Sequence, residues 1–368
     1  TVQWTITGYL LATGIAVPFS SWLLNKFNGK HVFLAGEVLF ALGSILSALA
    51  PNIQWLISAR VIQGFAGGLI MPLLTTLLVQ TAGAAAMGQM MATVGLPMIL
   101  GPLFGPVLGG IIIKSLSWHW IFWVNVPVGI ISISLILWKM PDYPAQNKAA
   151  KMDFGGIILL AGATTSIIYG IVKASKLANF TNQTTLTFLG SGLLLLIGYL
   201  IWAALRKEKA VLPLNLFTHA SFNGAGLGLL LAGTVLNGAM LLLPLFFQDV
   251  RGMTVMQAGL ALIPQGAGML VARTLTGRLT DSLGAKYVVL VSLVITFIGT
   301  LPFYWFDAHT AYWLIACVLI VRGIGAGGIL MPLMADAYTG MKPQQVPAAS
   351  IGSRIIQNIG SALGSALI

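Results

Sequence analysis

The side chains best placed for chemistry in this sequence are the few charged ones inside long apolar runs. Arg60 and Arg322 are two of these, and an arginine within a membrane span normally faces the interior or water and has a partner, because its charge is costly in lipid. Arg322 lies near the middle of its run, so we expect it in a central cavity or a buried pair. Gln63, on the adjoining helical face, favours a functional role for Arg60. The alternative for Arg60 is extension to the external headgroups, since Trp55 marks the nearby interface.

Acidic side chains are scarce, and none is an unambiguous proton carrier deep within a run. Glu37 lies just inside its run, where its carboxylate can reach toward Lys30 or His31, and this interfacial role is favoured over a role in transport. Met90 and Met98 belong to a methionine group that would give an adaptable apolar lining to a pocket for varied amphipathic compounds, and core filling explains them as well. Glu37, Met90 and Met98 are therefore the candidate substrate-facing residues.

One charge-free apolar stretch combines regularly spaced glycines with prolines. Its residues of interest are Gly101, Pro102, Gly105, Pro106, Gly109 and Gly110. On a helix, glycines at every fourth position form a groove without side chains, into which a neighbouring backbone can pack closely. The prolines remove backbone donors and bend the helix. The stretch therefore predicts a bent helix in the interior of a membrane bundle.

The composition excludes an ordinary soluble domain. Hydrophobic residues make up 57% of the 368 residues and charged residues only 7%, and the mean hydropathy is +0.93, so polar surface cannot cover the chain. The net charge of +11 would suggest nucleic acid in a soluble protein, but here the basic residues lie in short loops that orient spans. A single cysteine, Cys317, gives neither a disulfide framework nor a metal cluster. We predict a polytopic membrane protein that binds no nucleic acid and no metal.

The apolar runs and their loops predict the topology. Lysine and arginine gather in one set of alternate loops, which we assign to the cytoplasmic side. The chain starts at Thr1 and stops at Ile368 within an apolar run, so we expect its first and last spans to be missing. Runs long enough to cross a bilayer cover residues 4–22, 32–50, 54–79, 88–113, 119–138, 154–172, 185–205, 223–247, 258–278, 287–306 and 312–337, and a further run begins near 348.

An internal repeat divides the chain. Ala66–Pro72 (AGGLIMP) recurs as Ala326–Pro332 (AGGILMP), each one apolar run after a short basic turn, as parallel copies of one bundle would produce. We expect three regions: an N-terminal bundle at 1–138 without its first span, a two-span insert with cytoplasmic flanking loops at 139–222, and a C-terminal bundle at 223–368 that is truncated at its fifth span.

Two neighbouring motifs carry a resemblance to a known family. The stretch Gly101–Gly110, which reads GPxxGPxxGG, resembles the antiporter motif in the fifth span of exporters of the major facilitator superfamily. Trp118–Gly129 (WHWIFWVNVPVG) resembles the start of the sixth span in the fourteen-span drug:proton antiporter branch of the EmrB/QacA type. The resemblance implies an all-α membrane protein with two pseudo-symmetric six-helix bundles and a two-helix insert between them. It also makes the glycine–proline stretch the hinge and seal between inward-open and outward-open forms.

Two further motifs extend the resemblance. Arg60 matches the fourth-span RxxqG motif, to which the family attributes proton transfer, so Arg60, Gln63 and Arg322 are candidates for proton coupling or buried charge. The loop pattern GxLxDxxGxK, whose aspartate holds a closed cytoplasmic gate, is complete in the second half. The corresponding first-half turn lacks the aspartate, and there a role in topology alone is favoured. The candidate gate residues are Gly277, Asp281, Gly284 and Lys286.

These observations predict a secondary active exporter of small amphipathic or cationic compounds that exchanges them for protons by alternating access. No Walker loop, paired catalytic carboxylates or nucleophile group appears in the sequence, so we expect no enzyme and no cofactor. The expected partners are the bilayer, protons and, in a Gram-negative source, a periplasmic adaptor; the expected location is a bacterial inner membrane. One alternative is a dedicated exporter of a single metabolite, lipid precursor or antibiotic. Another is a ligand sensor or scaffold without transport.

Overall fold

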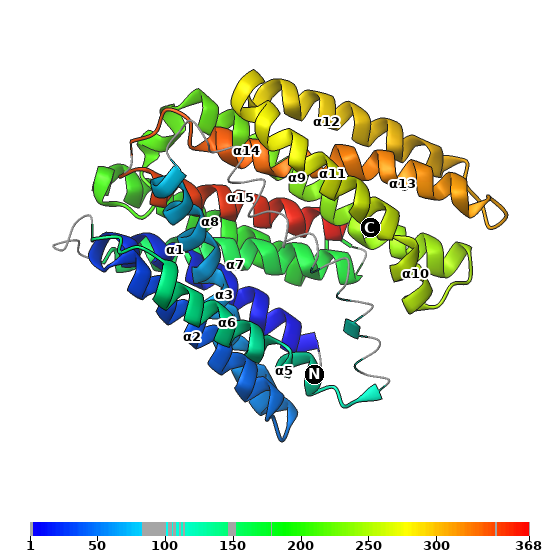
Figure 1. The fold of residues 1–368 in the computed structure, drawn as a ribbon. Helices are drawn as coiled ribbons and strands as arrows, with labels where there is room; N and C mark the ends of the chain where they lie inside the picture. The colour runs from blue at the N-terminus through cyan, green and yellow to red at the C-terminus, as the bar shows by residue number, and fades with distance from the viewer. Residues whose placement is uncertain are drawn as a thin grey trace. The chain divides into compact units, whose positions relative to one another are not determined.

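The computed structural model describes residues 3–82, 101, 105, 108–109, 112, 115–145, 152–177, 179–342 and 344–367. Within these ranges the ordered elements are all helices and none is a strand, which confirms the all-α prediction (Figure 1). The α-helices are α1 (Gln3–Lys26), α2 (Gly29–Ala48), α3 (Ile53–Ala82), α5 (Trp120–Trp123), α6 (Asn125–Lys139), α7 (Phe154–Leu177), α8 (Gln183–Arg206), α9 (Ala220–Leu245), α10 (Val255–Ala261), α11 (Ile263–Leu283), α12 (Ala285–Thr300), α13 (Tyr312–Gly327), α14 (Leu330–Ala337) and α15 (Val346–Ala366). Short turns are η2 (Lys207–Lys209), η3 (Leu214–Thr218), η4 (Phe246–Val250) and η5 (Leu301–Tyr304).

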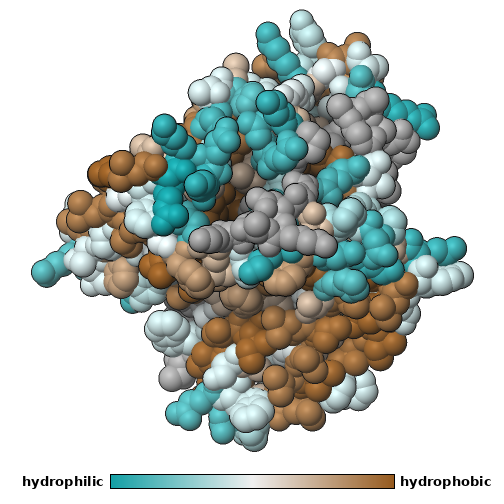
Figure 2. Space-filling model, turned by 90° about the vertical axis from the view of Figure 1, so that its left-hand side faces the viewer, coloured by the Kyte–Doolittle hydropathy of each residue, from teal (hydrophilic) through white to brown (hydrophobic). Residues whose placement is uncertain are grey.

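Nine helical segments of the described chain are long and apolar enough to cross a membrane. Each matches one of the predicted runs, from the run at 32–50 to the run at 312–337. Helix α1 covers the run predicted at 4–22, and α15 begins where the last run was predicted, whereas most of the run at 88–113 lies outside the described residues. Hydrophobic residues form a broad brown area on the surface shown in Figure 2, separate from the teal hydrophilic areas. This surface is what lipid contact requires.

The first of two compact units consists of Thr1–Thr81, Ile112–His219 and Gly340–Ile359. In it α7 packs against α8 and α1, and α2 packs against α6. The helices of the predicted two-span insert, α7 and α8, thus contact one another and α1, while the predicted boundaries at 138 and 222 stay predictions. Its buried apolar cluster comprises Ala16, Leu24, Val32, Phe33, Leu69, Leu73, Leu77 and Ile136.

The second unit contains Ala220–Thr339 and the part of α15 from Gly360 onward. Here α13 packs against both α11 and α12, and α14 packs against α9. The two copies of the AGG-x-x-MP sequence differ in helical continuity. Helix α3 continues through Pro72, whereas α13 ends at Gly327 and α14 starts at Leu330. A second apolar cluster comprises Leu243, Phe247, Ala258, Ala261, Ile315 and Leu319.

The two predicted basic turns use different local devices. Between α1 and α2 the Asn28 side chain caps α2 by accepting a hydrogen bond from the Lys30 backbone at 2.9 Å. Between α11 and α12 Gly284 adopts φ +86°, a conformation that glycine reaches without steric cost. Both turns end one helix and start the next within a few residues, so each turn connects its two helices directly.

Candidate functional site

Arg60 on α3 lies at the meeting point of three helices. Its Nη1 donates to Gln63 Oε1 at 2.6 Å and its Nε to the Thr5 carbonyl at 3.3 Å. The guanidinium stands over the ring of Tyr9 on α1, with its Cζ 4.3 Å from the ring centroid, an arrangement that attracts a cation to the ring face. Gln63 also binds α2, since its Nε2 donates to Ser44 Oγ at 2.7 Å. The guanidinium is therefore held by α1 and α3 and is linked through Gln63 to α2.

Arg322 on α13 is the largest fully buried side chain among the described residues, with 2% of its surface exposed. Its Nη1 donates to Gln265 Oε1 on α11 at 3.0 Å, and its Nε donates to Thr300 Oγ1 on α12 at 3.2 Å. A buried charge is costly unless hydrogen bonds offset the loss of water. Here these bonds tie three helices of the second unit to one guanidinium.

The two arginines share one electrostatic feature. Every hydrogen-bond acceptor that the described residues offer to either guanidinium is a neutral oxygen. Each group therefore carries an uncompensated positive charge at its site, which would favour a nearby anionic group and oppose a second cation. Sequence reasoning named both arginines and Gln63 but missed Gln265 and Thr300. The available signal was a polar residue within an apolar run, the pattern that singled out Gln63.

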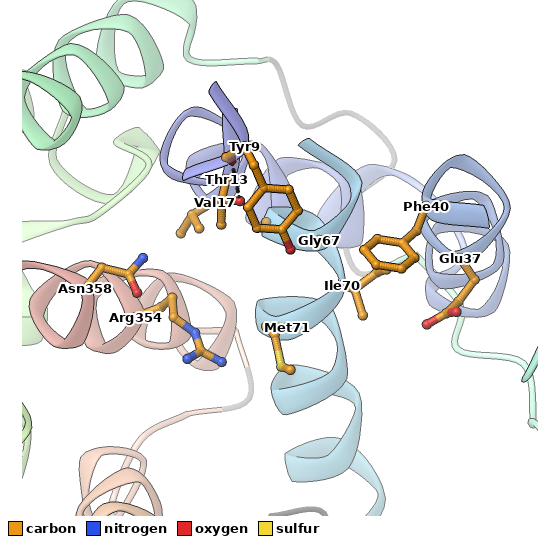
Figure 3. Close-up of a pocket in the computed structure, with 11 residues that line it drawn as sticks. Tyr9, Thr13, Val17, Glu37, Phe40, Gly67, Ile70, Met71, Arg354 and Asn358 are labelled. Atoms are coloured by element: carbon orange, nitrogen blue, oxygen red, sulfur yellow. Dashed lines mark hydrogen bonds between the residues drawn. The ribbon is translucent and has the colours of Figure 1, made fainter. Parts of the chain in front are cut away.

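A cavity of about 380 Å³ opens between helices of the first unit (Figure 3). Helices α1, α2, α3 and α15 supply its walls. Its lining residues are Tyr9, Thr13, Val17, Glu37, Phe40, Gly67, Gly68, Ile70, Met71, Arg354 and Asn358. Most of this lining is apolar or aromatic with a few polar groups, as in small-molecule sites generally.

Two opposite charges line this cavity. Figure 3 shows Glu37 beside Phe40 at one side of the cavity and Arg354 at the other, with Met71 between them. Glu37 is half-buried, and Ser132 on α6 faces its carboxyl group. Arg354 donates from Nη1 to Gln357 Oε1 at 2.8 Å. The cavity can therefore receive a molecule with a cationic end near Glu37, an apolar body and a polar end near Arg354.

Glycines let α1 and α3 approach closely enough to form this cavity wall. A Cβ added to Gly64 or Gly68 would collide with the backbone of Tyr9 or Thr13 on α1. Thr13 Oγ1 also donates to the Gly64 carbonyl at 3.0 Å. Because a side chain at either glycine would separate the helices, the small residues position Tyr9 against both the cavity and Arg60.

The predicted hinge is only partly described. Pro102, Pro106 and Gly110, together with Met90 and Met98, lie outside the described residues. Within the described part of the chain, a Cβ built on Gly101, Gly105 or Gly109 would have no atom within 4 Å apart from those of the glycine itself, its chain neighbours and its own helix backbone. The close packing of this groove and its role as a hinge therefore stay predictions.

The predicted gate residues follow one another at the α11–α12 turn. Gly277 and Asp281 lie on α11, Gly284 forms the turn with its positive φ, and Lys286 lies in the first turn of α12. Lys286 Nζ is 5.9 Å from the centroid of the neighbouring Tyr287 ring. The assignment of these residues to a cytoplasmic gate stays a prediction. Among the residues with described positions, no three His, Cys, Asp or Glu side chains are grouped to hold a metal.

Comparison with known proteins places these features in context. Residues 1–365 match the family described as Major Facilitator Superfamily. The chain is similar over its whole length to the multidrug resistance protein B homolog of Mycobacterium tuberculosis H37Rv, with 33% identity across 68% of that protein. It is 26% identical to the multidrug export protein EmrB of Escherichia coli K12, where the match covers 99% of this chain and 71% of EmrB.

Solved structures of transporters share the fold. The human organic anion transporter MFSD10 matches 99% of this chain and 76% of its own length with a TM-score of 0.72 at 15% identity. The proton:xylose symporter XylE matches 98% of this chain and 77% of its own length with a TM-score of 0.65, also at 15% identity. At this level of identity the match establishes the fold alone.

Proposed function

The chain belongs to the major facilitator superfamily, and from that premise we propose that it is a secondary active exporter of small amphipathic or cationic compounds, driven by the proton gradient. Its relatives include proteins named for multidrug resistance and multidrug export. In this proposal the protein works by alternating access in the plasma membrane of a bacterium and uses no cofactor; in a Gram-negative source a periplasmic adaptor completes the export route.

The observation that carries the proposal is the position of Glu37 in the cavity of the first unit. Its carboxylate is half-buried beside the aromatic ring of Phe40, so a lipophilic cation there would gain both charge attraction and apolar contact. The same carboxylate can bind a proton instead. A cation and a proton that compete for one carboxylate cannot occupy it together, and this exclusion is the basis of exchange.

Arg60 supports the proposal from the opposite direction. Arg60 stands over Tyr9, whose ring also lines the cavity. Because its charge has no carboxylate partner in the described chain, it opposes a cation close to the part of the Tyr9 ring that it covers, whereas the Glu37 carboxylate attracts one. We propose that the substrate is thereby oriented, with its cationic group toward α2.

Everted membrane vesicles that contain the full-length protein test the energy source. We expect a fluorescent lipophilic cation to accumulate when a pH gradient is imposed, and accumulation to stop when the gradient is collapsed. Depletion of ATP under an imposed gradient should leave accumulation unchanged. Accumulation that follows ATP rather than the pH gradient would contradict the proposal.

The Glu37→Gln variant tests the site in the same vesicles, because it keeps the shape of the side chain and removes its charge. We expect accumulation to be lost, while a matched Gln257→Glu control should transport normally, since that residue is exposed at the start of α10. Normal exchange by Glu37→Gln would assign the coupling acid to another residue.

A further inference from the structure

A second pocket lies at the end of α8, away from the cavity already described. Its volume is about 380 Å³. The wall combines two alanines at the end of α8 with residues of the segment that follows. Its lining residues are Ala203, Ala204, Lys207, Glu208, Leu214 and Asn215. All of these residues belong to the first unit.

The chain is folded back firmly to make this pocket. Tyr199 on α8 is 1% exposed; its hydroxyl accepts a hydrogen bond from the Leu212 backbone N–H at 2.7 Å and donates to the Leu212 carbonyl at 3.1 Å. The reversal occurs at Lys207, the single non-glycine residue of the described chain with a positive φ, at 53°. The segment 207–215 is therefore held against the end of α8 rather than extending away from it.

The polar groups of the pocket are complementary to a zwitterion. Lys207 offers an ammonium group and Glu208 a carboxylate, both at exposed positions of the η2 turn. Asn215 also lines the pocket, but its Oδ1 is enclosed by the protein and does not face a ligand. A ligand that fits these groups carries a phosphate-like anion for Lys207 and a donor-bearing cation for Glu208.

An apolar surface runs directly from this pocket along α8. Leu194, Ile201 and Leu205 expose 70%, 60% and 78% of their side chains, as residues that face lipid chains do. At the same end the Arg206 guanidinium stands 4.8 Å from the Trp202 ring centroid, and arginine with tryptophan is typical of the headgroup level of a membrane. The pocket thus lies where a lipid headgroup would be if its chains followed α8.

We propose that this pocket binds the headgroup of phosphatidylethanolamine. Its phosphate would contact Lys207, its ammonium would donate to Glu208, and its acyl chains would lie along the exposed face of α8. Phosphatidylcholine offers the same phosphate but has no N–H donor. An anionic headgroup such as phosphatidylglycerol would meet repulsion from Glu208. The site is independent of the export function proposed above.

The test uses the purified, delipidated full-length protein in detergent, with Tm measured after addition of single phospholipids. We expect phosphatidylethanolamine to raise Tm by several degrees, and phosphatidylcholine and phosphatidylglycerol to raise it clearly less. Equal shifts with phosphatidylethanolamine and phosphatidylcholine would overturn the proposal. A larger shift with phosphatidylglycerol than with phosphatidylethanolamine would overturn the zwitterionic assignment. An equal shift with soluble glycerophosphoethanolamine would overturn the lipid source.

Variants locate the site. Lys207→Gly removes the ammonium group and suits the positive φ, so the fold should be retained while the phosphatidylethanolamine shift is lost. Glu208→Gln should reduce the preference for phosphatidylethanolamine over phosphatidylcholine. Lys209→Ala, on the same turn but outside the pocket, is the matched control and should keep the full shift. An unchanged shift in both Lys207→Gly and Glu208→Gln would overturn the site.

Discussion

Gln63 in the first unit and Arg322 in the second occupy equivalent positions of two similar helix packings, although one is a neutral amide and the other a cation. A Cβ on Gly43 of α2 would lie 2.9 Å from the Gln63 backbone, and a Cβ on Gly299 of α12 would lie 2.5 Å from the Arg322 backbone nitrogen. In each unit a glycine lets the helix pair meet at this residue. The structural counterpart of Arg322 is therefore Gln63, not Arg60.

The hydrogen-bond acceptors confirm this equivalence. Ser44 follows Gly43 and accepts from Gln63, just as Thr300 follows Gly299 and accepts from Arg322. The acceptor is a hydroxyl in both units, and only the donor has changed. The first unit places its guanidinium one turn earlier, on Arg60, where more of it is exposed. One packing can therefore hold either a buried charge or a neutral amide that is hydrogen-bonded to a charge nearer the surface.

The alignment of the two repeat copies by sequence differs by one residue from their alignment by helix contacts. The AGG sequences align Gly67 with Gly327. In the structure it is Gly68 whose Cβ would meet the Thr13 backbone and Ala16, while the Cβ of Gly327 would meet the Met269 backbone. The packing therefore aligns Gly68 with Gly327.

Removal of the buried guanidinium is the largest change that the comparison suggests. Arg322→Ala leaves Gln265 and Thr300 without their donor and opens a cavity, so we expect a loss of about 2–4 kcal/mol in unfolding free energy and no transport. Thermal unfolding and vesicle transport measure the two effects. Val321→Ala, on an exposed face of the same helix, is the control. Full transport by Arg322→Ala would show that the charge has no role in export.

Arg322→Gln replaces the cation with the residue found at the equivalent position in the first unit. Because glutamine can donate to Thr300 as Gln63 donates to Ser44, we expect Tm to fall less than in Arg322→Ala while transport is still lost. A Tm equal to that of Arg322→Ala would contradict the equivalence of the two packings.

Alanine substitutions test the register. Gly68→Ala and Gly327→Ala should each destabilise the protein by about 1–3 kcal/mol, because the new methyl group meets backbone atoms that cannot easily move. Gly67→Ala should cost less, since its nearest contact is the hydroxyl end of the Tyr9 side chain at 2.9 Å. If Gly67→Ala lowered Tm as much as Gly327→Ala does, the result would instead support the alignment of Gly67 with Gly327 that the sequence repeat gives.

Arg60→Lys should have the smallest effect of the series. Lysine keeps the charge over Tyr9 but loses the planar fork that contacts both Thr5 and Gln63, so we expect partial transport and a small fall in Tm. Arg322→Lys, at the fully buried site, should abolish transport. Equal transport by the two lysine variants would remove the contrast between the half-buried guanidinium of Arg60 and the fully buried one of Arg322.

The sequence alone predicted the membrane class and the apolar spans, and it singled out Arg60 and Arg322 as candidate site residues. It could do so because hydropathy and the cost of a charge in lipid are local properties. It could not assign Gln265 and Thr300 to Arg322, since these residues belong to other helices and only packing brings them together. For Glu37 the sequence favoured a role at the membrane interface, because the residue lies close to the end of its apolar run. Its place in the cavity depends on how α2 is rotated against α3, which local spacing does not determine.

Proton release on substrate binding shows whether a cationic substrate and a proton compete for Glu37. Purified full-length protein in weakly buffered solution would be mixed with a lipophilic cation while the pH of the solution is recorded. We expect wild-type protein to release protons on binding and Glu37→Gln to release none. Equal proton release by wild-type protein and Glu37→Gln would show that the two do not compete for Glu37.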